Sequence, residues 1–91
     1  MYDVLTKLRQ LESSPIGKTL VVITKFRNNL DGIVDVYAQG FKGPVVSVEK
    51  SGDGWKAFAF DSTWLGCDTI EQISIWTSQK LSEILAAQQI S

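Results

Sequence analysis

The sequence has no histidine and only one cysteine, Cys67. Without histidine the chain lacks the commonest general base at neutral pH and the commonest metal ligand. The Ser-His-Asp and Cys-His arrangements of nucleophilic catalysis are excluded for the same reason. A single cysteine also excludes an internal disulfide and the four-cysteine zinc frameworks. These absences predict a protein that is not an enzyme.

Motifs for cofactors and metals are missing too. No glycine-rich loop followed by lysine is present, so nothing predicts a phosphate cradle for a nucleotide. Asp53 lies between Gly52 and Gly54, but the carboxylate spacing of a calcium loop is absent, and a plain turn is the favoured interpretation. No spacing pairs two carboxylates as an acid and a base. We expect no catalytic residue, no metal ligand and no cofactor.

Long apolar segments are absent as well. No apolar run approaches the ~20 residues that a membrane helix needs, and residues 1–8 lack the basic and then apolar order of a signal peptide. The 91 residues are 44% hydrophobic and 21% charged, which is typical of a folded globular protein. We therefore expect one soluble domain, residues 1–91, with a cytoplasmic location and no membrane contact.

Basic residues are scarce in the last third of the chain. Residues 61–91 contain one cation, Lys80, and four carboxylates, those of Asp61, Asp68, Glu71 and Glu83. The whole chain has a formal net charge of −1, which argues against general affinity for nucleic acid. The sequence predicts an acidic C-terminal element on a mildly basic body.

Residues 18–60 contain the segments that favour β-structure. Segments rich in β-branched and aromatic residues predict strands at 19–26, 33–38, 45–50 and 55–60. Their connections are too short for parallel crossovers, so the strands should form an antiparallel meander. Asp31-Gly32 is the expected first turn and would place Phe26 opposite Tyr37, while Asn28-Asn29 is the alternative turn.

A helix is expected on each side of the strands. Val4, Leu8 and Leu11 form one apolar stripe, with Asp3 as the expected N-cap and Pro15 ending the helix. After a loop at 61–67, a longer helix should begin at Asp68, with Glu71 completing a capping box. Its buried face should comprise Ile70, Ile73, Thr77, Leu81, Ile84 and Leu85. The predicted fold is α+β, a two-layer sandwich of order α-β-β-β-β-α with both helices on one sheet face.

Three groups of side chains have a functional and a structural interpretation. Cys67 precedes a helix start, which favours a thiolate, but a packing role is the favoured interpretation because no basic neighbour follows in sequence. Some aromatic side chains could be exposed for a partner, Trp64 above all, or could pack in the core; these are Tyr37, Phe41, Trp55 and Trp64. A third group could gather as a phosphate-binding patch or form a solvated face; these are Lys25, Arg27, Lys42, Lys50 and Lys56.

Residues 44–85 resemble the core of the HicB-type antitoxins. The resemblance lies in the strand 44–50, the Asp53-Gly54 turn, the strand 55–61, Leu65-Gly66-Cys67 and the helix start Asp68-Thr69-Ile70-Glu71. The chain departs from the family pattern by lacking two loop prolines and about three residues before Asp68. The resemblance implies a bacterial protein that neutralises a toxin by binding it.

These observations predict a small, non-catalytic inhibitor of antitoxin or immunity type. A nuclease toxin has a basic active site, and complementary charge speeds association. The expected contact residues are Asp61, Trp64, Asp68, Glu71 and Glu83. Two alternatives stay open: a structural or ligand-binding module that oligomerises, for example as a homodimer, through a sheet edge, and a weak nucleic-acid binder that uses basic residues of the sheet.

Overall fold

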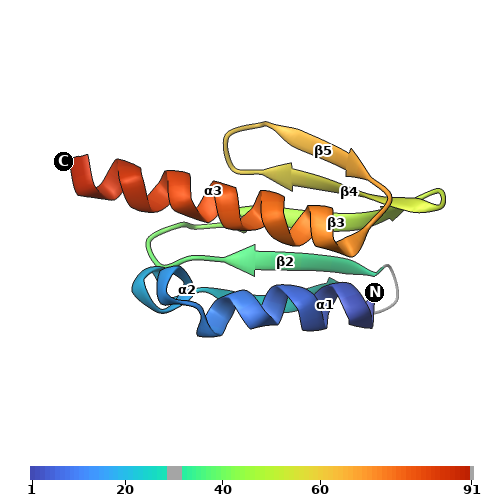
Figure 1. The fold of residues 1–91 in the computed structure, drawn as a ribbon, viewed down its shortest axis with the longest axis horizontal. Coiled ribbons are helices and arrows are strands. Elements are labelled where there is room, and N and C mark those ends of the chain that lie inside the picture. Colours follow the sequence, from blue (N-terminus) through green and yellow to red (C-terminus); the bar gives the residue numbers. More distant parts are fainter. Residues whose placement is uncertain (29–31, 91) are drawn as a thin grey trace.

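A computed structural model of the chain describes residues 1–28 and 32–90. These residues form one antiparallel sheet of five strands in the order β1-β2-β3-β4-β5, with helices packed on it (Figure 1). The elements are α1 (Tyr2–Arg9), the 3-10 helix η1 (Gln10–Ser13), α2 (Pro15–Leu20), β1 (Ile23–Asn28), β2 (Ile33–Tyr37), β3 (Val46–Ser51), β4 (Gly54–Ala59), β5 (Trp64–Cys67) and α3 (Ile70–Ile90). The predicted α+β fold is confirmed, with one strand more than expected.

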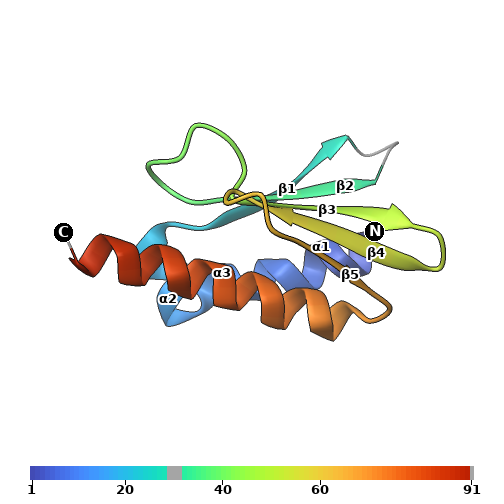
Figure 2. The same cartoon turned by 90° about the horizontal axis from the view of Figure 1, so that it is seen from above.

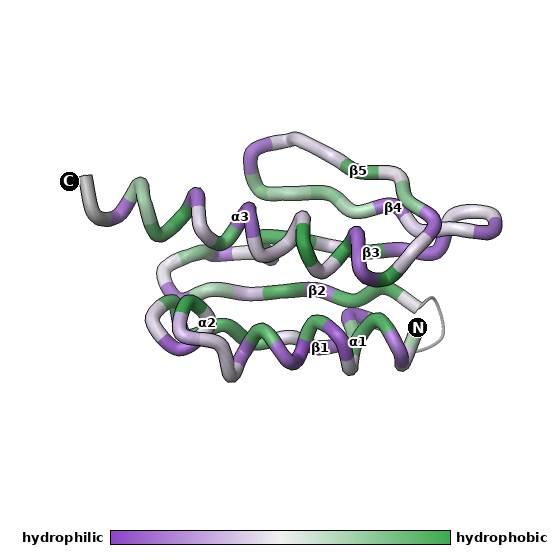
Figure 3. The backbone as a smooth tube through the Cα atoms, in the orientation of Figure 1, coloured by the Kyte–Doolittle hydropathy of each residue, from purple (hydrophilic) through white to green (hydrophobic). Residues whose placement is uncertain are grey.

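The core lies between the sheet and the helices. Figure 2 shows α1, α2 and α3 on the same side of the sheet, as predicted for the helices. Apolar residues recur along α1, β2 and α3 in Figure 3, as expected for elements that contribute side chains to one core. The side chains buried in this layer include Leu8, Val34, Val36, Val46, Val48, Ala57, Ile73 and Leu81. The opposite face of the sheet has no helix on it among the described residues.

A short helix occupies part of the predicted first strand. Ser14 is the N-cap of α2 and accepts a hydrogen bond from the Gly17 N–H at 3.1 Å, and Pro15 follows at the first helical position. The C-cap of this helix is Val21, which has a left-handed φ of 53°. Pro15 does end the preceding helical segment, but it also begins this one. The strand predicted at 19–26 was therefore wrong at its start, and β1 begins at Ile23.

The predicted pairing of Phe26 with Tyr37 was wrong. Tyr37 lies opposite Ile23, and Phe26 lies opposite Val34, with an irregularity between Phe26 and Asn28. The aromatic partner of Phe26 is Tyr2 of α1, whose ring is 5.1 Å away at 83°. Both candidate turns, Asp31-Gly32 and Asn28-Asn29, include residues outside the described ranges.

The predicted helix caps differ from the observed ones by one or two residues. Asp3 is not the N-cap of α1, because the helix begins at Tyr2 and its cap is Met1. The helix α3 begins at Ile70, so Asp68 and Glu71 do not form the capping box. Thr69 and Gln72 form it instead: the Gln72 N–H donates to Thr69 Oγ1, and Gln72 Oε1 accepts from the Thr69 N–H, both at 3.3 Å.

Residues 61–67 were predicted to be a loop, and part of them is a strand. Trp64–Cys67 forms β5, which pairs with β4 so that Trp64 lies opposite Phe58 and Cys67 opposite Trp55. The four residues Trp64-Leu65-Gly66-Cys67 are too few to show a clear alternation of polar and apolar side chains. Tertiary pairing with β4 decides their conformation. The fifth strand forms one edge of the sheet.

Candidate binding surface

The sheet face without helices carries charged and aromatic side chains in rows across the strands. One row runs from Lys25 through Asp35, Ser47 and Phe58 to Trp64, since each residue lies opposite the next in the strand register. Side chains that are directly opposite lie close enough to interact. We call this surface the open face. Its most exposed large hydrophobic side chain is Trp64, of which 60% is accessible.

A buried carboxylate organises the middle of the open face. Arg27 holds Asp35 with two hydrogen bonds, Nε to Oδ2 at 2.8 Å and Nη2 to Oδ1 at 2.9 Å. Ser47 Oγ donates to Asp35 Oδ1 at 2.6 Å, and the Tyr37 hydroxyl donates to Oδ2 at 3.3 Å. Burial raises the pKa of Asp35, but the hydrogen bonds from Arg27 and Ser47 and the guanidinium charge outweigh it and hold the pKa below its ordinary value. The network fixes β1, β2 and β3 together on a face that no helix covers.

Each cation of the open face contacts a neighbouring aromatic ring or carboxylate. Lys25 Nζ lies 4.9 Å from the centre of the Tyr37 ring. Lys56 Nζ lies 5.6 Å from the Phe58 ring and 4.9 Å from the Trp64 ring. Such contacts stabilise a cation over an aromatic face. Of the predicted basic group, Lys25, Arg27 and Lys56 share this face, whereas Lys50 lies over Trp55 on the opposite face and Lys42 lies in the β2–β3 connection.

The two edge strands of the sheet differ in whether side chains bind their outward main-chain groups. At β1, the Thr24 N–H donates to the Glu12 carboxylate, and Arg9 Nε approaches the Thr24 carbonyl at 3.5 Å. Side chains from α1 and η1 therefore occupy the outward main-chain groups at Thr24. At β5, the Ala59 N–H donates to the Thr63 carbonyl, which fixes the alternation of hydrogen-bonded pairs along β4 and β5. In that alternation the main-chain groups of Trp64 and Gly66 point away from β4, toward the outside of the sheet.

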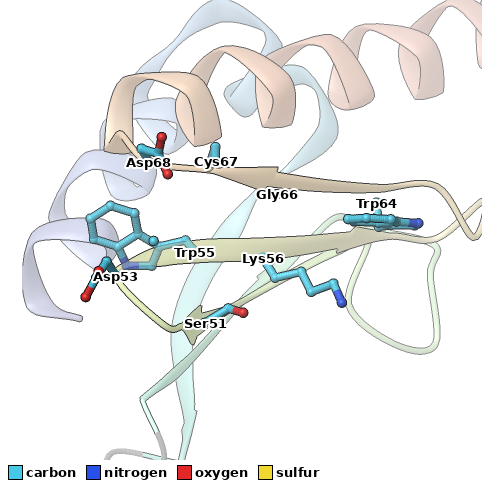
Figure 4. Close-up of a pocket in the computed structure, with 9 residues that line it drawn as sticks. Ser51, Asp53, Trp55, Lys56, Trp64, Gly66, Cys67 and Asp68 are labelled. Atoms are coloured by element: carbon cyan, nitrogen blue, oxygen red, sulfur yellow. The ribbon is translucent and has the colours of Figure 1, made fainter.

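A hollow of about 370 Å³ lies beside this open edge. Gly66 leaves space where a side chain would otherwise stand, and Trp64, Lys56, Asp53 and Asp68 surround the hollow (Figure 4). Gly54 could not carry a side chain, because a Cβ there would come within 2.3 Å of the Cys67 carbonyl oxygen. A Cβ on Gly66 would lie 3.6 Å from the Trp64 ring, an ordinary contact. The hollow thus has an aromatic wall and a carboxylate wall.

The structure brings together some of the predicted contact residues and separates others. Trp64 and Asp68 both line the hollow, and Glu71 is exposed in the first turn of α3 nearby. Asp61 and Glu83 lie together at the other end of β5, where Lys80 Nζ reaches Asp61 Oδ2 at 3.1 Å and Glu83 Oε2 at 3.3 Å. The predicted acidic surface is therefore two clusters. The cluster at Asp68 and Glu71 has no ion pair with a cation among the described residues.

The cluster at Lys80 is partly neutralised. Hydrogen bonds from Thr63 and Lys80 and the Lys80 charge lower the pKa of Asp61 to about 2, although burial opposes the shift. Burial lowers the pKa of Lys80, but its hydrogen bonds to Asp61 and Glu83 outweigh burial and leave that pKa above its ordinary value. Lys80 thus supplies one positive charge against the two carboxylates of Asp61 and Glu83. Their sum is one negative charge spread over three side chains.

The packing interpretation of Cys67 is supported. Its side chain is half-buried on the helix side of β5. Burial and the Asp68 charge raise the pKa of the thiol, although a hydrogen bond from the Thr69 N–H opposes them. A thiol with a raised pKa is a poor nucleophile at neutral pH. Cys67 therefore contributes packing in this structure.

The aromatic group divides between surface and core. Trp64 is exposed as predicted. Trp55, on β4, is partly buried and packs against the core. Phe41 stands edge-on to Phe60 at 5.6 Å, beside a second hollow of about 280 Å³ that Ile84 and Glu83 of α3 also line. The sequence did not point to Gly66 or to Asp53 as site residues. Only the β4–β5 register, which sequence did not supply, places them beside Trp64 and Asp68.

Two kinds of feature are absent from the described residues. No group of three or more acidic or cysteine side chains in that part of the chain is arranged to hold a metal ion. No helix in residues 1–28 and 32–90 is long and apolar enough to cross a membrane. Comparison with known proteins adds nothing further, because no family model, no curated protein and no solved structure matches the chain significantly.

Proposed function

We propose that this chain is a non-catalytic protein-binding inhibitor of the antitoxin or immunity type, which neutralises a basic toxin, such as a nuclease, by direct binding. The observation that supports this most is the grouping of Trp64 with the unpaired carboxylates of Asp53 and Asp68 around the hollow. Exposed tryptophan is the residue most enriched in interface hot spots. Free carboxylates beside it suit a cationic partner surface.

Several cations on the rest of the surface already contact aromatic rings or carboxylates, which supports an acidic contact surface. Lys25, Lys56 and Lys80 lie over aromatic rings, and Lys80 also pairs with two carboxylates. Arg27 is bound to Asp35. Within residues 1–28 and 32–90 the carboxylates of Asp68 and Glu71 form no ion pair, so they remain available to a partner. Of the five contact residues, Asp68 and Trp64 should contribute most, and Asp61 and Glu83 less, because Lys80 already partly neutralises them.

The test is capture of the toxin followed by binding and rescue measurements. The tagged chain is recovered from its native cells, and a small basic protein that binds it one to one is expressed alone and with the chain. We expect the captured protein to stop growth alone and the chain to restore it. Calorimetric titration with Asp68→Lys should then show at least a tenfold weaker affinity.

The matched control is Asp3→Lys, which makes the same charge change at an exposed residue of α1, far from β5. Affinity should stay within about twofold of the wild type. If Asp68→Lys and Asp3→Lys bind the toxin equally well, the proposed surface is wrong. If no basic protein is captured and no toxin is neutralised, the proposed function is wrong.

A nucleic-acid binder is the second candidate, and one observation favours it. Tyr37, Phe58 and Trp64 share the open face with Lys25 and Lys56, and single strands bind to sheets that combine aromatic and cationic side chains. Binding of a fluorescent single-stranded RNA that falls steeply with salt would favour this candidate. Absence of RNA binding at low salt would exclude this candidate function.

A further inference from the structure

The open edge at β5 has a shape that is complementary to itself. Trp64 and Gly66 are the residues of β5 whose main-chain groups point outward, and they flank Leu65 symmetrically. A second copy that approaches antiparallel can satisfy these groups only by placing its Gly66 opposite Trp64 and its Trp64 opposite Gly66. Figure 1 shows β5 as the outermost strand, with no helix beyond it. The edge is therefore open to another strand.

The geometry points to a homodimer in which two copies pair antiparallel through β5, with the two-fold axis between the two Leu65 residues. The two sheets then join into one, and each Trp64–Gly66 pair exchanges both of its main-chain hydrogen bonds. This pairing uses the one strand edge whose outward groups no side chain of the described residues occupies. The β1 edge cannot serve equally, because Glu12 and Arg9 bind the main chain at Thr24.

Side chains fit the same register. Trp64 and Gly66 both face the open side of the sheet, because Phe58 and Lys56 lie opposite them on β4. In the dimer, the Trp64 ring of one copy lies directly across from Gly66 of the other, where the hollow provides space. The two Trp64 rings are then diagonal neighbours across the axis, close enough for aromatic contact. Contact between the two Trp64 rings would favour the association, while the sides of the rings that face away from the sheet stay accessible to a partner.

The dimer also changes the acidic surface. With Leu65 on the axis, Cys67 of one copy lies opposite Thr63 of the second, and Asp68 lies beside the turn that contains Asp61. The two acidic clusters that are separate within one chain thus become neighbours between chains. Carboxylates that approach one another repel, so the dimer should tighten as salt rises. That this joined surface receives a toxin rests on the proposed function, whereas the dimer does not.

A designed disulfide tests the register. Thr63→Cys places a thiol opposite the native Cys67 of the second copy, at a pair without main-chain hydrogen bonds, where the Cα atoms lie about 4.5 Å apart. Mild oxidation with copper phenanthroline should link most of the chains into dimers at micromolar concentration. Ser62→Cys is the matched control, because residue 62 lies in the β4–β5 turn and would face position 68, and not Cys67, of the second copy. Equal cross-linking of the two variants would overturn the register.

Mass in solution tests the dimer itself. The chain has a mass of 10.1 kDa, and sedimentation at about 100 μM should give twice that value. Gly66→Pro removes an outward N–H and no hydrogen bond to β4, so the fold should persist while the dimer dissociates at least tenfold more readily. Trp64→Ala should have a similar effect. A wild-type chain that stays at 10.1 kDa up to about 1 mM would overturn the dimer.

The homodimer and the toxin-binding function can be disproved independently of each other. If Gly66→Pro is monomeric and still binds the toxin as tightly as the wild type, the dimer stands and the joined acidic surface is not what the toxin uses. If the wild type is monomeric but binds the toxin, the dimer is wrong and the proposed function stands.

Discussion

Arg27 and Asp35 form a forked ion pair on the face of the sheet that the helices leave open, with nitrogen–oxygen distances of 2.8 and 2.9 Å. The Asp35 side chain is only 1% accessible, although that of Arg27 is 51% accessible. The guanidinium thus covers the carboxylate and replaces the water that it would otherwise bind. Fork-shaped pairs of this kind are the strongest class of side-chain hydrogen bond.

Arg27→Met should therefore destabilise the fold. It leaves a covered carboxylate with Ser47 and Tyr37 as its remaining donors, and we expect a loss of about 1.5–3 kcal/mol in the free energy of unfolding. Because the pKa of Asp35 is lowered in the fold, its contribution is present above its unfolded pKa and is lost as pH falls through the folded value. Urea titrations should show a large difference at pH 7 that shrinks below about pH 4. A difference that is constant from pH 7 to pH 3 would contradict this account.

Gly17→Ala should strongly destabilise the fold, although alanine is normally the better helix residue. A Cβ at position 17 would lie 1.8 Å from the Leu11 carbonyl oxygen, so η1 and α2 could not keep their present contact. Overpacking against main chain costs about 1–3 kcal/mol or more. Circular dichroism during heating should show a strongly lowered Tm. Gly43→Ala is the control, because a Cβ there meets nothing within 4 Å, and its Tm should stay close to that of the wild type.

The sequence predicts the fold class because its periodic segments are long. The apolar residues of α3 recur at helical spacing over several turns, and Ile73, Thr77, Leu81 and Ile84 are buried as expected. The strands 33–38, 45–50 and 55–60 each match an observed strand within about a residue. Short elements were missed, since α2 has six residues and β5 has four. In such elements long-range pairing outweighs local preference.

The candidate site was predicted in part for a related reason. Trp64 was predicted to be exposed because it would lie in a loop without a periodic pattern to bury it; its exposure is confirmed, although it lies in the strand β5. The grouping of Trp64 with Asp68 and Gly66 requires the β4–β5 register. The ion pair of Lys80 with Asp61 joins residues that are 19 positions apart, and no local pattern indicates it. Sequence could name the acidic residues but could not divide them into two clusters.

Glu12 should protect the β1 edge of the sheet. Its carboxylate accepts a hydrogen bond from the N–H of Thr24, a residue that is 2% accessible. Glu12→Ala leaves that buried N–H without an acceptor, and we expect a loss of about 1–3 kcal/mol. Glu12→Gln keeps an acceptor oxygen at the same place and should lose clearly less. Chemical denaturation of both variants measures the difference; equal losses would mean that the negative charge, and not the hydrogen bond, stabilises the edge.

Replacing Thr77, a buried polar residue, with an apolar residue should stabilise the fold. Its side chain is fully buried on the core face of α3, and its hydroxyl has no hydrogen-bond partner among the described residues. A buried hydroxyl without a partner costs about 1–3 kcal/mol. Thr77→Val replaces the hydroxyl with a methyl group of similar size, so we expect the variant to be about 1 kcal/mol more stable in urea titrations. Thr77→Ala is the control, since it removes the hydroxyl but leaves a cavity, and it should gain less than Thr77→Val or lose stability. A Thr77→Val variant that is less stable than the wild type would show that the hydroxyl does bind a partner in solution.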